Sequence, residues 1–228
     1  MEDEVKLRFY GRRKGRALTK YQKELIETKL PQVAVSLDNL SGKKVWLEIG
    51  FGGGEHLSFQ AGLFPEVSFI GCEPFLNGVA SLLTHLEREK RTNVSIFHGD
   101  ARALVKEMPP QFLEKVFILY PDPWPKARHG KRRIIQTEFI KSLAKILKPN
   151  GEIVIATDDD NYADHVAEVF ASLPEYSGPN TKDGQTNPPQ NWIETRYEAR
   201  AKRLGNTSYY FNYIHHLSAP GCVDVQAS

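Results

Sequence analysis

The chain has 228 residues, 40% of them hydrophobic, which suits one large domain with a sizeable core better than two domains. Its two cysteines, Cys72 and Cys222, are too few for a disulfide framework. No stretch of about 18 apolar residues predicts a membrane span, and the first residues lack the apolar segment of a signal peptide. We therefore expect a cytoplasmic protein that makes no membrane contact.

Although the net charge is only +2, the basic residues are concentrated in two segments. Residues 5–23 contain eight Lys or Arg, residues 123–137 contain five, and neither segment contains an acid. The remaining 17 basic residues face all 28 acids, which leaves the rest of the chain at −11. An acidic body with two basic patches indicates a localised site for a polyanion. We therefore predict a basic arm at 1–17, for which a disordered solubilising tail is the alternative, and a single domain at 18–228.

The predicted elements begin with a helix at 19–30, which ends before Pro31. After it, short apolar runs alternate with helical patterns. Strands are predicted at 44–49, 67–72, 94–98, 115–120 and 152–156. Helices are predicted between them at 55–63, 75–90, 136–147 and 160–172. This alternation predicts an α/β fold with a mostly parallel sheet and helices on both faces.

The last part of the chain predicts a different arrangement. Residues 174–193 contain four prolines and two glycines and indicate a long loop, which in a compact domain is usually functional or disordered. A helix at 194–204 with Gly205 as its C-cap and a strand within 207–217 follow. These two late elements predict an antiparallel edge that closes a doubly wound sheet.

Strand 44–49 leads into a glycine-rich turn that contains Gly50 and Gly52. A dinucleotide-binding G-x-G-x-x-G loop would need glycine at the position of Glu55, whose carboxylate would repel a pyrophosphate. A cofactor without phosphates fits better, and S-adenosylmethionine carries an ammonium and a sulfonium that favour acidic neighbours. We expect Glu48, at the strand end, to receive the ammonium directly or through water.

The next two strands also end in acids. Glu73, about 20 residues past the glycine turn, suits the hydroxyls of a ribose, and Asp100 is placed to accept from an adenine amino group. Acids at the ends of the first three strands line the crevice in which open α/β sheets bind ligands. The alternative for any one of them is a helix N-cap or first-turn carboxylate, for which Asp100 is well suited.

Residues 120–126, Tyr-Pro-Asp-Pro-Trp-Pro-Lys, follow a strand that reads as buried. Prolines stiffen this loop, and a stiff loop at a strand end holds its side chains in place for a ligand. Asp122 can accept two N–H donors, and Trp124 offers a stacking face. Basic side chains that suit phosphates follow at once: Lys126, Arg128, Lys131, Arg132 and Arg133. The combination suits a purine within a nucleic acid; the alternative is a surface turn beside a solvated charge run.

Two further motifs lie near later strand ends and helix starts. Asp158 is nearest the end of its strand, so we expect it to contact substrate, whereas Asp159 and Asp160 suit a helix N-cap. Thr195 followed three residues later by Glu198 fits a capping box. None of the seven histidines has metal-ligand spacing, so we predict no metal.

Taken together, these motifs resemble the bacterial tRNA (guanine-N7-)-methyltransferase family. The segments that carry the resemblance are 9–16, 48–54, 71–73, 100–101, 121–133, 157–160 and 195–198. The proline-tryptophan segment is specific to that family, whereas the glycine loop indicates only a methyltransferase. The resemblance implies a Rossmann-like fold whose sheet has seven strands, mostly parallel, with an antiparallel edge.

The resemblance also implies roles for individual residues, with Asp122 as the catalytic aspartate. The implied S-adenosylmethionine-binding positions are Glu48, Gly50, Gly52, Glu73, Asp100, Ala101 and Asp122. The implied substrate positions are Lys126, Asp158, Thr195, Arg196, Tyr197 and Glu198. From the charge pattern we expect tRNA contacts from Arg12, Arg13, Arg128, Lys131, Arg132 and Arg133.

The expected activity is methyl transfer from S-adenosylmethionine to N7 of a guanine in the tRNA variable loop. The N7 lone pair carries no proton, so catalysis needs positioning and electrostatics rather than a base. Asp122 or Asp158 would hold the guanine edge, and Trp124 or Tyr197 would stack on the base. Two alternatives stay open: a small-molecule or protein methyltransferase, and a non-catalytic RNA-binding module. The sequence leaves open whether the protein is a monomer or a homodimer.

Overall fold

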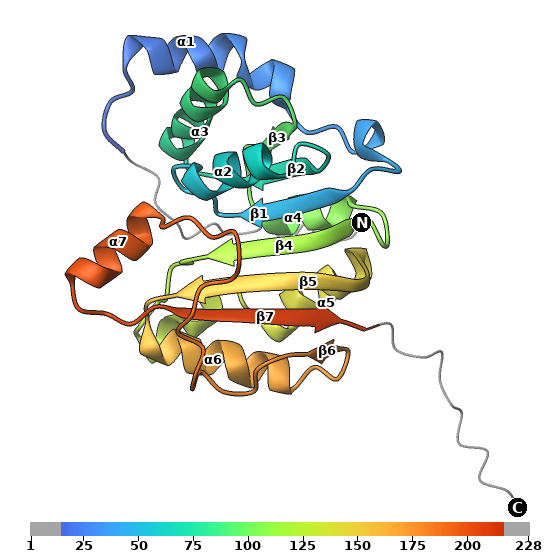
Figure 1. The fold of residues 1–228 in the computed structure, drawn as a ribbon, viewed down its shortest axis with the longest axis vertical. Helices are drawn as coiled ribbons and strands as arrows, with labels where there is room; N and C mark the ends of the chain where they lie inside the picture. Colours follow the sequence, from blue (N-terminus) through green and yellow to red (C-terminus); the bar gives the residue numbers. More distant parts are fainter. Residues whose placement is uncertain (1–14, 217–228) are drawn as a thin grey trace, which may run out of the picture.

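The computed structural model describes residues 15–216, which form one seven-stranded sheet covered by helices (Figure 1). The strands lie in the order β3-β2-β1-β4-β5-β7-β6. Their bounds are β1 Val45–Ile49, β2 Ser68–Cys72, β3 Val94–Phe97, β4 Leu113–Leu119, β5 Leu147–Thr157, β6 Tyr176–Ser177 and β7 Tyr209–His215. Strands β1 to β5 run parallel, whereas β7 pairs antiparallel with both β5 and β6. The predicted fold class is therefore confirmed.

Helices connect the strands and cover both faces of the sheet. The α-helices of the described part are α1 Lys20–Thr28, α2 Glu55–Leu63, α3 Leu76–Glu89, α4 Ala101–Glu107, α5 Thr137–Ile146, α6 Asp160–Ala171 and α7 Arg196–Arg203. Short 3₁₀-helices are η1 Leu30–Val33, η2 Asp38–Leu40 and η3 Ala127–Arg132. Within residues 15–216, no helix is both long and apolar enough to cross a membrane.

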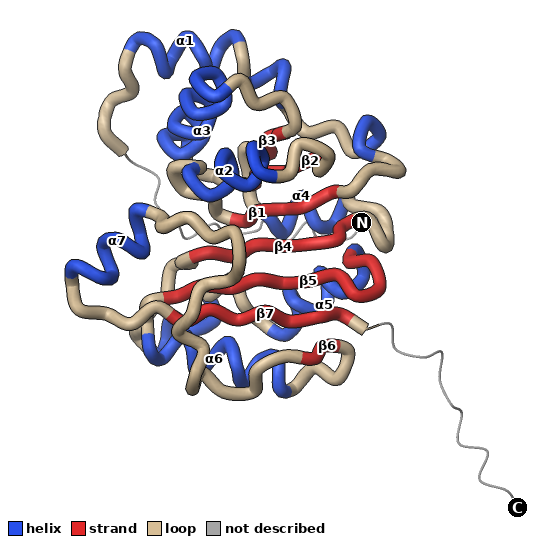
Figure 2. The backbone as a smooth tube through the Cα atoms, in the orientation of Figure 1, coloured by secondary structure: helices blue, strands red, loops and turns tan. Residues whose placement is uncertain are grey.

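Different helices cover the two faces of the sheet. Alternate residues of each strand point to opposite faces, so neighbouring residues join different clusters. On one face, Val116 of β4 belongs to a core that includes residues of α4, α5 and α6. On the other face, Leu57 of α2 and Leu83 of α3 pack over β1 to β3. Phe117 of β4 lies on that second face, where Trp192 packs against its cluster. Figure 2 shows the connection from β6 to α7 crossing β5 and β4 on its way to α7.

Nearly all predicted bounds agree with the structure within two residues, and β5 is the exception. It begins at Leu147 rather than at 152, because Leu147 pairs with Leu113 across a register shift in β4. Asn150, with φ of 61°, bends the strand there, and a bend of this kind is easily taken for a turn in the sequence. The two-residue strand β6, within the predicted loop, was not predicted, and the seven-residue helix α4 was expected only from Asp100 as an N-cap, without bounds. Both are too short to show a periodic pattern.

Candidate active site

The loop between β1 and α2 turns at glycines in left-handed conformations. Gly50 has φ of 71° and Gly52 has φ of 56°, a region that residues with a Cβ seldom adopt. The Gly50 N–H donates to the carbonyl of Cys72 in β2 (2.7 Å), which fixes the loop at the carboxyl edge of the sheet. A Cβ at Gly52 would lie 2.9 Å from the ring of Tyr197. The loop therefore presents bare backbone that another group can approach closely.

Glu73, which follows β2, is held by the same loop. One of its carboxylate oxygens accepts the N–H of Gly52 (2.9 Å) and the other accepts the N–H of Phe75 (2.9 Å). Burial raises the pKa of Glu73, and the nearby charge of Asp122 raises it further. Each oxygen keeps lone-pair capacity beyond its one backbone bond. The carboxylate is therefore a fixed acceptor in the crevice, as the prediction of a ribose contact requires.

Glu48, at the end of β1, is paired with a residue that the sequence did not single out. Its Oε2 lies 2.7 Å from Nδ1 of His56, and the two side chains are only 3% and 2% exposed. The His56 ring also packs against Phe117 and Trp192, with ring centroids 4.9 Å and 5.1 Å away. His56 lies eight residues after Glu48 on an otherwise unremarkable helix, so only the burial of that helix face could have drawn attention to it.

Asp100 has the capping role that its sequence position left open. It is the N-cap of α4, accepting the N–H of Arg102 (2.9 Å), and the first helical residue is Ala101, which is buried. Its carboxylate also accepts from Arg102 Nε (3.0 Å) and Nη2 (2.6 Å). Partial burial opposes the charge, but the hydrogen bonds from Arg102 outweigh it and lower the pKa of Asp100. An ionised acceptor thus stands at the end of β3.

The loop after β4 is strained as well as rich in proline. Tyr120 and Trp124 have φ of 49° and 45°, which is uncommon for bulky side chains and characteristic of functional sites. Asp122 lies between them with an exposed side chain. Neighbouring protein atoms nevertheless desolvate it enough to raise its pKa. Its charge also raises the pKa of Glu73, and both carboxyl groups follow parallel strands that flank β1 and end at the same edge of the sheet.

The basic segment that follows divides into anchored and exposed residues. Arg133 donates to the carbonyl of Pro123 (2.8 Å), and Arg132 lies 5.0 Å from the centre of the Trp124 ring. These contacts fold η3 back onto the loop, so one face of Trp124 is covered by a guanidinium. The exposed basic side chains are Lys126, Arg128 and Lys131.

The three consecutive acids after β5 differ in their contacts, and only one of the two suited to an N-cap has that position. Asp159 is the N-cap of α6 and accepts the N–H of Tyr162 (2.8 Å). Asp160 is tied to Lys182, with its Oδ2 2.7 Å from the ammonium. Asp158 precedes both and accepts from the amide of Asn206 (3.3 Å), and its side chain is only partly buried. Among the described contacts, Asp158 alone of the three neither caps a helix nor pairs with a charged side chain.

Helix α7 brings Thr195, Arg196 and Tyr197 over the glycine loop. Thr195 caps the helix by accepting the N–H of Glu198 (3.2 Å). Arg196 Nε lies 3.5 Å from Oε1 of Glu55, the first residue of α2. Tyr197 is 41% exposed and stacks on Tyr120 with an interplanar angle of 18°. Side chains that are about 145 positions apart in the chain thus meet at one edge of the sheet.

Glu198 does not join this surface. It is 3% exposed and accepts from Nε1 of Trp192 (2.7 Å) and from Lys202 (3.1 Å). Burial opposes its charge, but these hydrogen bonds outweigh it and lower the pKa of Glu198. Trp192, which the sequence analysis did not name, therefore ties the start of α7 to the body. The sequence offered one indication of this role, which is that Trp192 is a large aromatic residue within a long, mostly polar loop.

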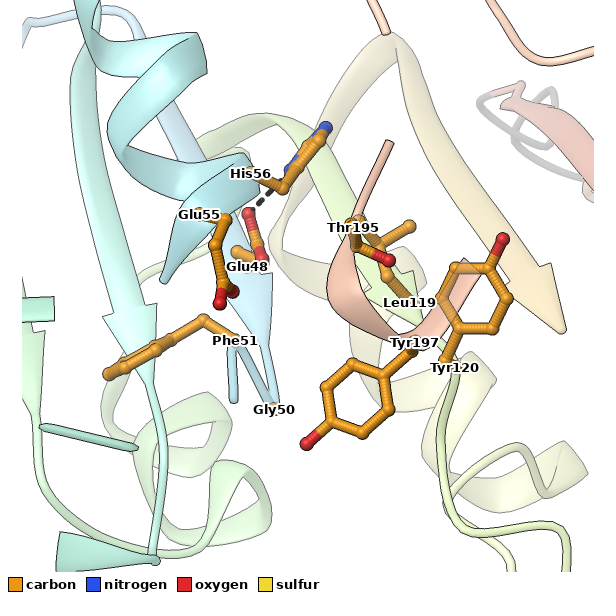
Figure 3. A pocket seen from close by; sticks show the side chains of 9 residues that line it. All are labelled: Glu48, Gly50, Phe51, Glu55, His56, Leu119, Tyr120, Thr195 and Tyr197. Atoms are coloured by element: carbon orange, nitrogen blue, oxygen red, sulfur yellow. Dashed lines mark hydrogen bonds and ion pairs between the residues drawn. The ribbon is translucent and has the colours of Figure 1, made fainter. Parts of the chain in front are cut away.

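A small cavity lies between these elements, and Figure 3 shows its lining from close by. Its volume is about 10 Å³, roughly enough for one water molecule. The residues that line it are Glu48, Gly50, Phe51, Glu55, His56, Leu119, Tyr120, Thr195 and Tyr197. Tyr120 and Tyr197 stand across from Gly50 in this view. The crevice is therefore narrow where α7 faces the glycine loop.

Some of the predicted site residues lie outside the described residues. Arg12 and Arg13 lie outside residues 15–216, as does most of the predicted arm. In the described part, no group of three or more His, Cys, Asp or Glu side chains is placed to hold a metal ion.

Comparison with known proteins agrees with this geometry. Residues 42–211 match the protein-family profile described as "Putative methyltransferase". A tRNA (guanine-N(7)-)-methyltransferase of Caulobacter vibrioides is 44% identical, with 90% of this chain and 93% of that protein covered. One from Zymomonas mobilis is 40% identical, with the same coverage. An rRNA methylase structure from Streptococcus thermophilus matches with a TM-score of 0.52 and 14% identity over 88% of this chain and 99% of that one, which supports the fold. The chain therefore belongs to the tRNA (guanine-N(7)-)-methyltransferase family.

Proposed function

We propose that this protein transfers a methyl group from S-adenosylmethionine to N7 of a guanine in the variable loop of tRNA. One observation carries the proposal: Asp122, on a stiff loop with exposed basic residues, follows β4 at the same edge of the parallel sheet as the acids that end β1 and β2. Relatives at 40–44% identity carry the name tRNA (guanine-N(7)-)-methyltransferase, which supports the same substrate and position.

The donor set fits S-adenosylmethionine, which when bound supplies an electrophilic methyl group. Glu73, whose oxygens are fixed by two backbone N–H groups, would accept from the ribose hydroxyls. Glu48 would receive the ammonium, and Asp100 would accept from the adenine amino group. Ala101, the first residue of α4, would lie beside the adenine. Gly50 and Gly52 offer the close backbone approach that such a ligand needs.

The chain's own part in the reaction is to position the guanine. Asp122 is exposed and keeps both carboxylate oxygens for the N1–H and N2–H₂ edge, and Asp158 stands at the next strand end as a second acceptor. Because N7 needs no deprotonation, these carboxylates hold and orient the base rather than remove a proton from it. Tyr197 is a better stacking surface than Trp124, because Arg132 already covers one face of the Trp124 ring.

The tRNA backbone would be held by the exposed part of the basic segment and by the arm. Lys126, Arg128 and Lys131 extend from the side of the crevice that holds Asp122. The arm at 1–17 supplies a second concentration of positive charge, including Arg12 and Arg13. Phosphate contacts of this kind set orientation rather than sequence, so recognition of the variable loop rests on shape together with the pocket. We place the activity in the cytoplasm, in a monomer or a homodimer.

Nucleoside mass spectrometry tests the proposal. Unmodified tRNA incubated with the protein and methyl-labelled S-adenosylmethionine should yield labelled 7-methylguanosine, and Asp122→Asn should yield far less under the same conditions. Fragment analysis should place the label in the variable loop. Label in another nucleoside, or methylation of free metabolites in preference to tRNA, would overturn the proposal.

A further inference from the structure

Glu48 is paired at the crevice with His56, a residue to which the proposed function gives no role. The carboxylate and the imidazole are both almost completely buried and lie 2.7 Å apart. An ionised carboxylate only accepts hydrogen bonds, so the proton of this bond belongs to Nδ1 of His56. The tautomer of the ring is thereby fixed by Glu48.

The other nitrogen of His56 has no comparable partner. Nε2 is buried and meets no hydrogen-bonding atom among the described residues. The ring lies instead between the aromatic rings of Phe117 and Trp192. A buried polar atom without a partner is unusual in a folded protein and calls for an explanation. With the proton on Nδ1, the unpartnered atom is a neutral acceptor, which costs less than an unpaired donor or charge.

The surroundings make the pair rigid rather than mobile. Phe117 belongs to β4 and Trp192 to the segment that ties down α7, so the imidazole is clamped between the sheet and that segment. Glu48 lines the cavity beneath α7, next to Gly50. The hydrogen bond from His56 engages Oε2 and restricts the rotation of the carboxyl group. Oε1 is then the oxygen left for a ligand.

We propose that His56 is a positioning residue for the cofactor: it holds Glu48 so that the carboxylate meets the ammonium of S-adenosylmethionine in a fixed orientation. This inference rests on the proposed function, because it takes the ligand of Glu48 from it. His56 does not touch the reacting atoms. Its contribution is that Glu48 loses no rotational freedom when the ligand binds, and preorganised acceptors bind more tightly for that reason.

Two amide substitutions separate positioning from packing. In His56→Asn, the amide nitrogen falls near the place of Nδ1 and keeps a donor for Glu48. In His56→Gln, the amide falls near the place of Nε2 and leaves the carboxylate without its partner. By calorimetry with S-adenosylhomocysteine, we expect His56→Asn to bind within about threefold of the unsubstituted protein and His56→Gln to bind at least about tenfold more weakly. His56→Leu, a second variant without a donor, should match His56→Gln.

A ligand without the amino group supplies the decisive comparison. 5′-Methylthioadenosine keeps the adenosine and the thioether but has no ammonium for Glu48. Its affinity should change by less than about twofold in all three variants, since the ribose and adenine contacts do not depend on His56. Equal losses for both ligands would show a general disturbance of the crevice and overturn the positioning role.

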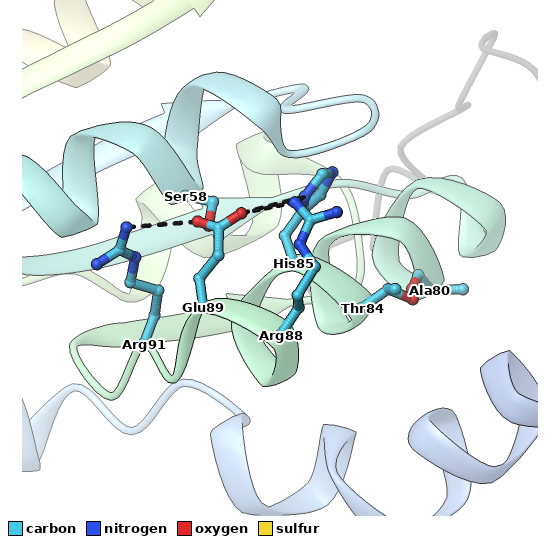
Figure 4. Close-up of polar contacts among 7 residues, drawn as sticks. All are labelled: Ser58, Ala80, Thr84, His85, Arg88, Glu89 and Arg91. Atoms are coloured by element: carbon cyan, nitrogen blue, oxygen red, sulfur yellow. Dashed lines mark hydrogen bonds and ion pairs between the residues drawn. The ribbon is translucent and has the colours of Figure 1, made fainter.

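Ser58→Ala is the matched control on the same helix. Ser58 is as buried as His56, but its hydroxyl donates to Glu89 of α3 (2.8 Å), away from the crevice (Figure 4). We expect this variant to unfold at a lower temperature and yet bind S-adenosylhomocysteine normally. Equal affinity of His56→Gln and His56→Asn would overturn the proposal while leaving the proposed function intact. Absence of binding to the unsubstituted protein would overturn both.

Discussion

The two sides of the crevice are built in opposite ways. At the ends of β1, β2 and β3, the acids Glu48, Glu73 and Asp100 are each held by a partner within the chain, and the first two are buried. Across from them, Asp122 and Tyr197 are exposed. The side that holds Glu48, Glu73 and Asp100, here the closed side, is therefore organised before any ligand arrives. The side that holds Asp122 and Tyr197, here the open side, presents charge and ring surface to solvent.

This difference matches the two kinds of ligand that the proposed reaction brings together. A small ligand with a few polar groups gains most from acceptors that are already fixed, because little ordering remains to be done on binding. A tRNA is large and charged, and its phosphates need accessible basic side chains more than a closed pocket. The strained backbone at Tyr120 and Trp124 lies on the open side, where the base must be oriented. The comparison predicts different consequences for substitutions on the two sides.

The largest effect is expected on the open side. Asp122→Asn keeps the shape of the side chain but removes the charge and one of the two acceptors for the guanine edge. We expect the single-turnover rate of methyl transfer to fall by about 100-fold or more, a typical cost for a residue that acts in the transition state. Calorimetry with S-adenosylhomocysteine should show a smaller loss of affinity, from the cofactor contact that the family resemblance also implies for Asp122. A rate within tenfold of the unsubstituted enzyme would remove Asp122 from the catalytic role.

The same substitution has an opposite effect on stability. Desolvation raises the pKa of Asp122, so the folded state holds its proton more tightly than the unfolded state does. The contribution of this group is then most favourable below the unfolded pKa and is lost as pH rises through the folded pKa. Asp122→Asn should therefore unfold at a slightly higher temperature at pH 7, and the difference should shrink in acid. A lower unfolding temperature at pH 7 would contradict this sign.

On the closed side, Glu73→Ala should act on cofactor affinity. The substitution removes the proposed ribose acceptor and leaves the N–H groups of Gly52 and Phe75 without their partner. A hydrogen bond to a charged group contributes about 1.5–3 kcal/mol, so the Kd for S-adenosylhomocysteine should rise at least about tenfold. Glu73→Gln keeps an acceptor oxygen and should lose less. Unchanged affinity in Glu73→Ala would exclude the ribose contact.

The sequence predicted the closed side better than the open side, for a physical reason. Acids at the carboxyl ends of parallel strands are gathered by the topology itself, so Glu48, Glu73 and Asp100 needed only correct strand assignments. The partners of those acids depend on how side chains pack between elements. The sequence spacing of His56 and Arg102 does not indicate that they pair with Glu48 and Asp100. Backbone periodicity contains no such information.

On the open side, the motif was evident but its internal contacts were not. The five basic residues read as one patch, yet Arg132 and Arg133 are folded back onto Trp124 and Pro123. The family resemblance placed Glu198 among the substrate positions, whereas its side chain is on the buried side of α7. Loops that fold on themselves follow no repeating pattern, so their contacts become visible only in three dimensions.

An intermediate effect is expected where the two sides are joined. Trp192→Phe keeps a smaller aromatic ring but removes the indole N–H that donates to the buried Glu198 carboxylate. The free energy of unfolding should fall by about 1–3 kcal/mol, as measured by denaturant titration. tRNA methylation should fall several-fold, because α7 is less firmly held, while the affinity for S-adenosylhomocysteine should stay nearly constant. A selective loss of cofactor affinity instead would show that Trp192 serves the closed side.

Smaller effects should distinguish exposed from anchored basic residues. Arg128→Ala and Lys131→Ala should each weaken tRNA binding a few-fold and lower the slope of log K against log salt by about one unit, if each contacts one phosphate. Arg133→Ala should chiefly lower stability, because its guanidinium holds the Pro123 carbonyl. Deleting residues 1–17 should flatten the slope further without changing cofactor affinity. An unchanged slope after that deletion would show that the arm is a solubilising tail that does not contact tRNA.

The smallest expected effect is the pH dependence of methyl transfer, and it sharpens the role given to Asp122. Methylation of guanine at N1 or N2 must release a proton from the nucleophilic site, so its rate would rise with pH. Attack by N7 releases none, so the single-turnover rate should change less than about twofold between roughly pH 6.5 and 8.5. Below that window the rate should fall as essential carboxylates protonate. Because desolvation raises the pKa of Asp122, and burial raises that of Glu73, this decline should begin at a higher pH than for free carboxylates. Asp122→Asn should slow the reaction without creating an alkaline rise. A tenfold increase per pH unit across the window would instead require a general base and would contradict the assignment of Asp122 as a residue that orients the base.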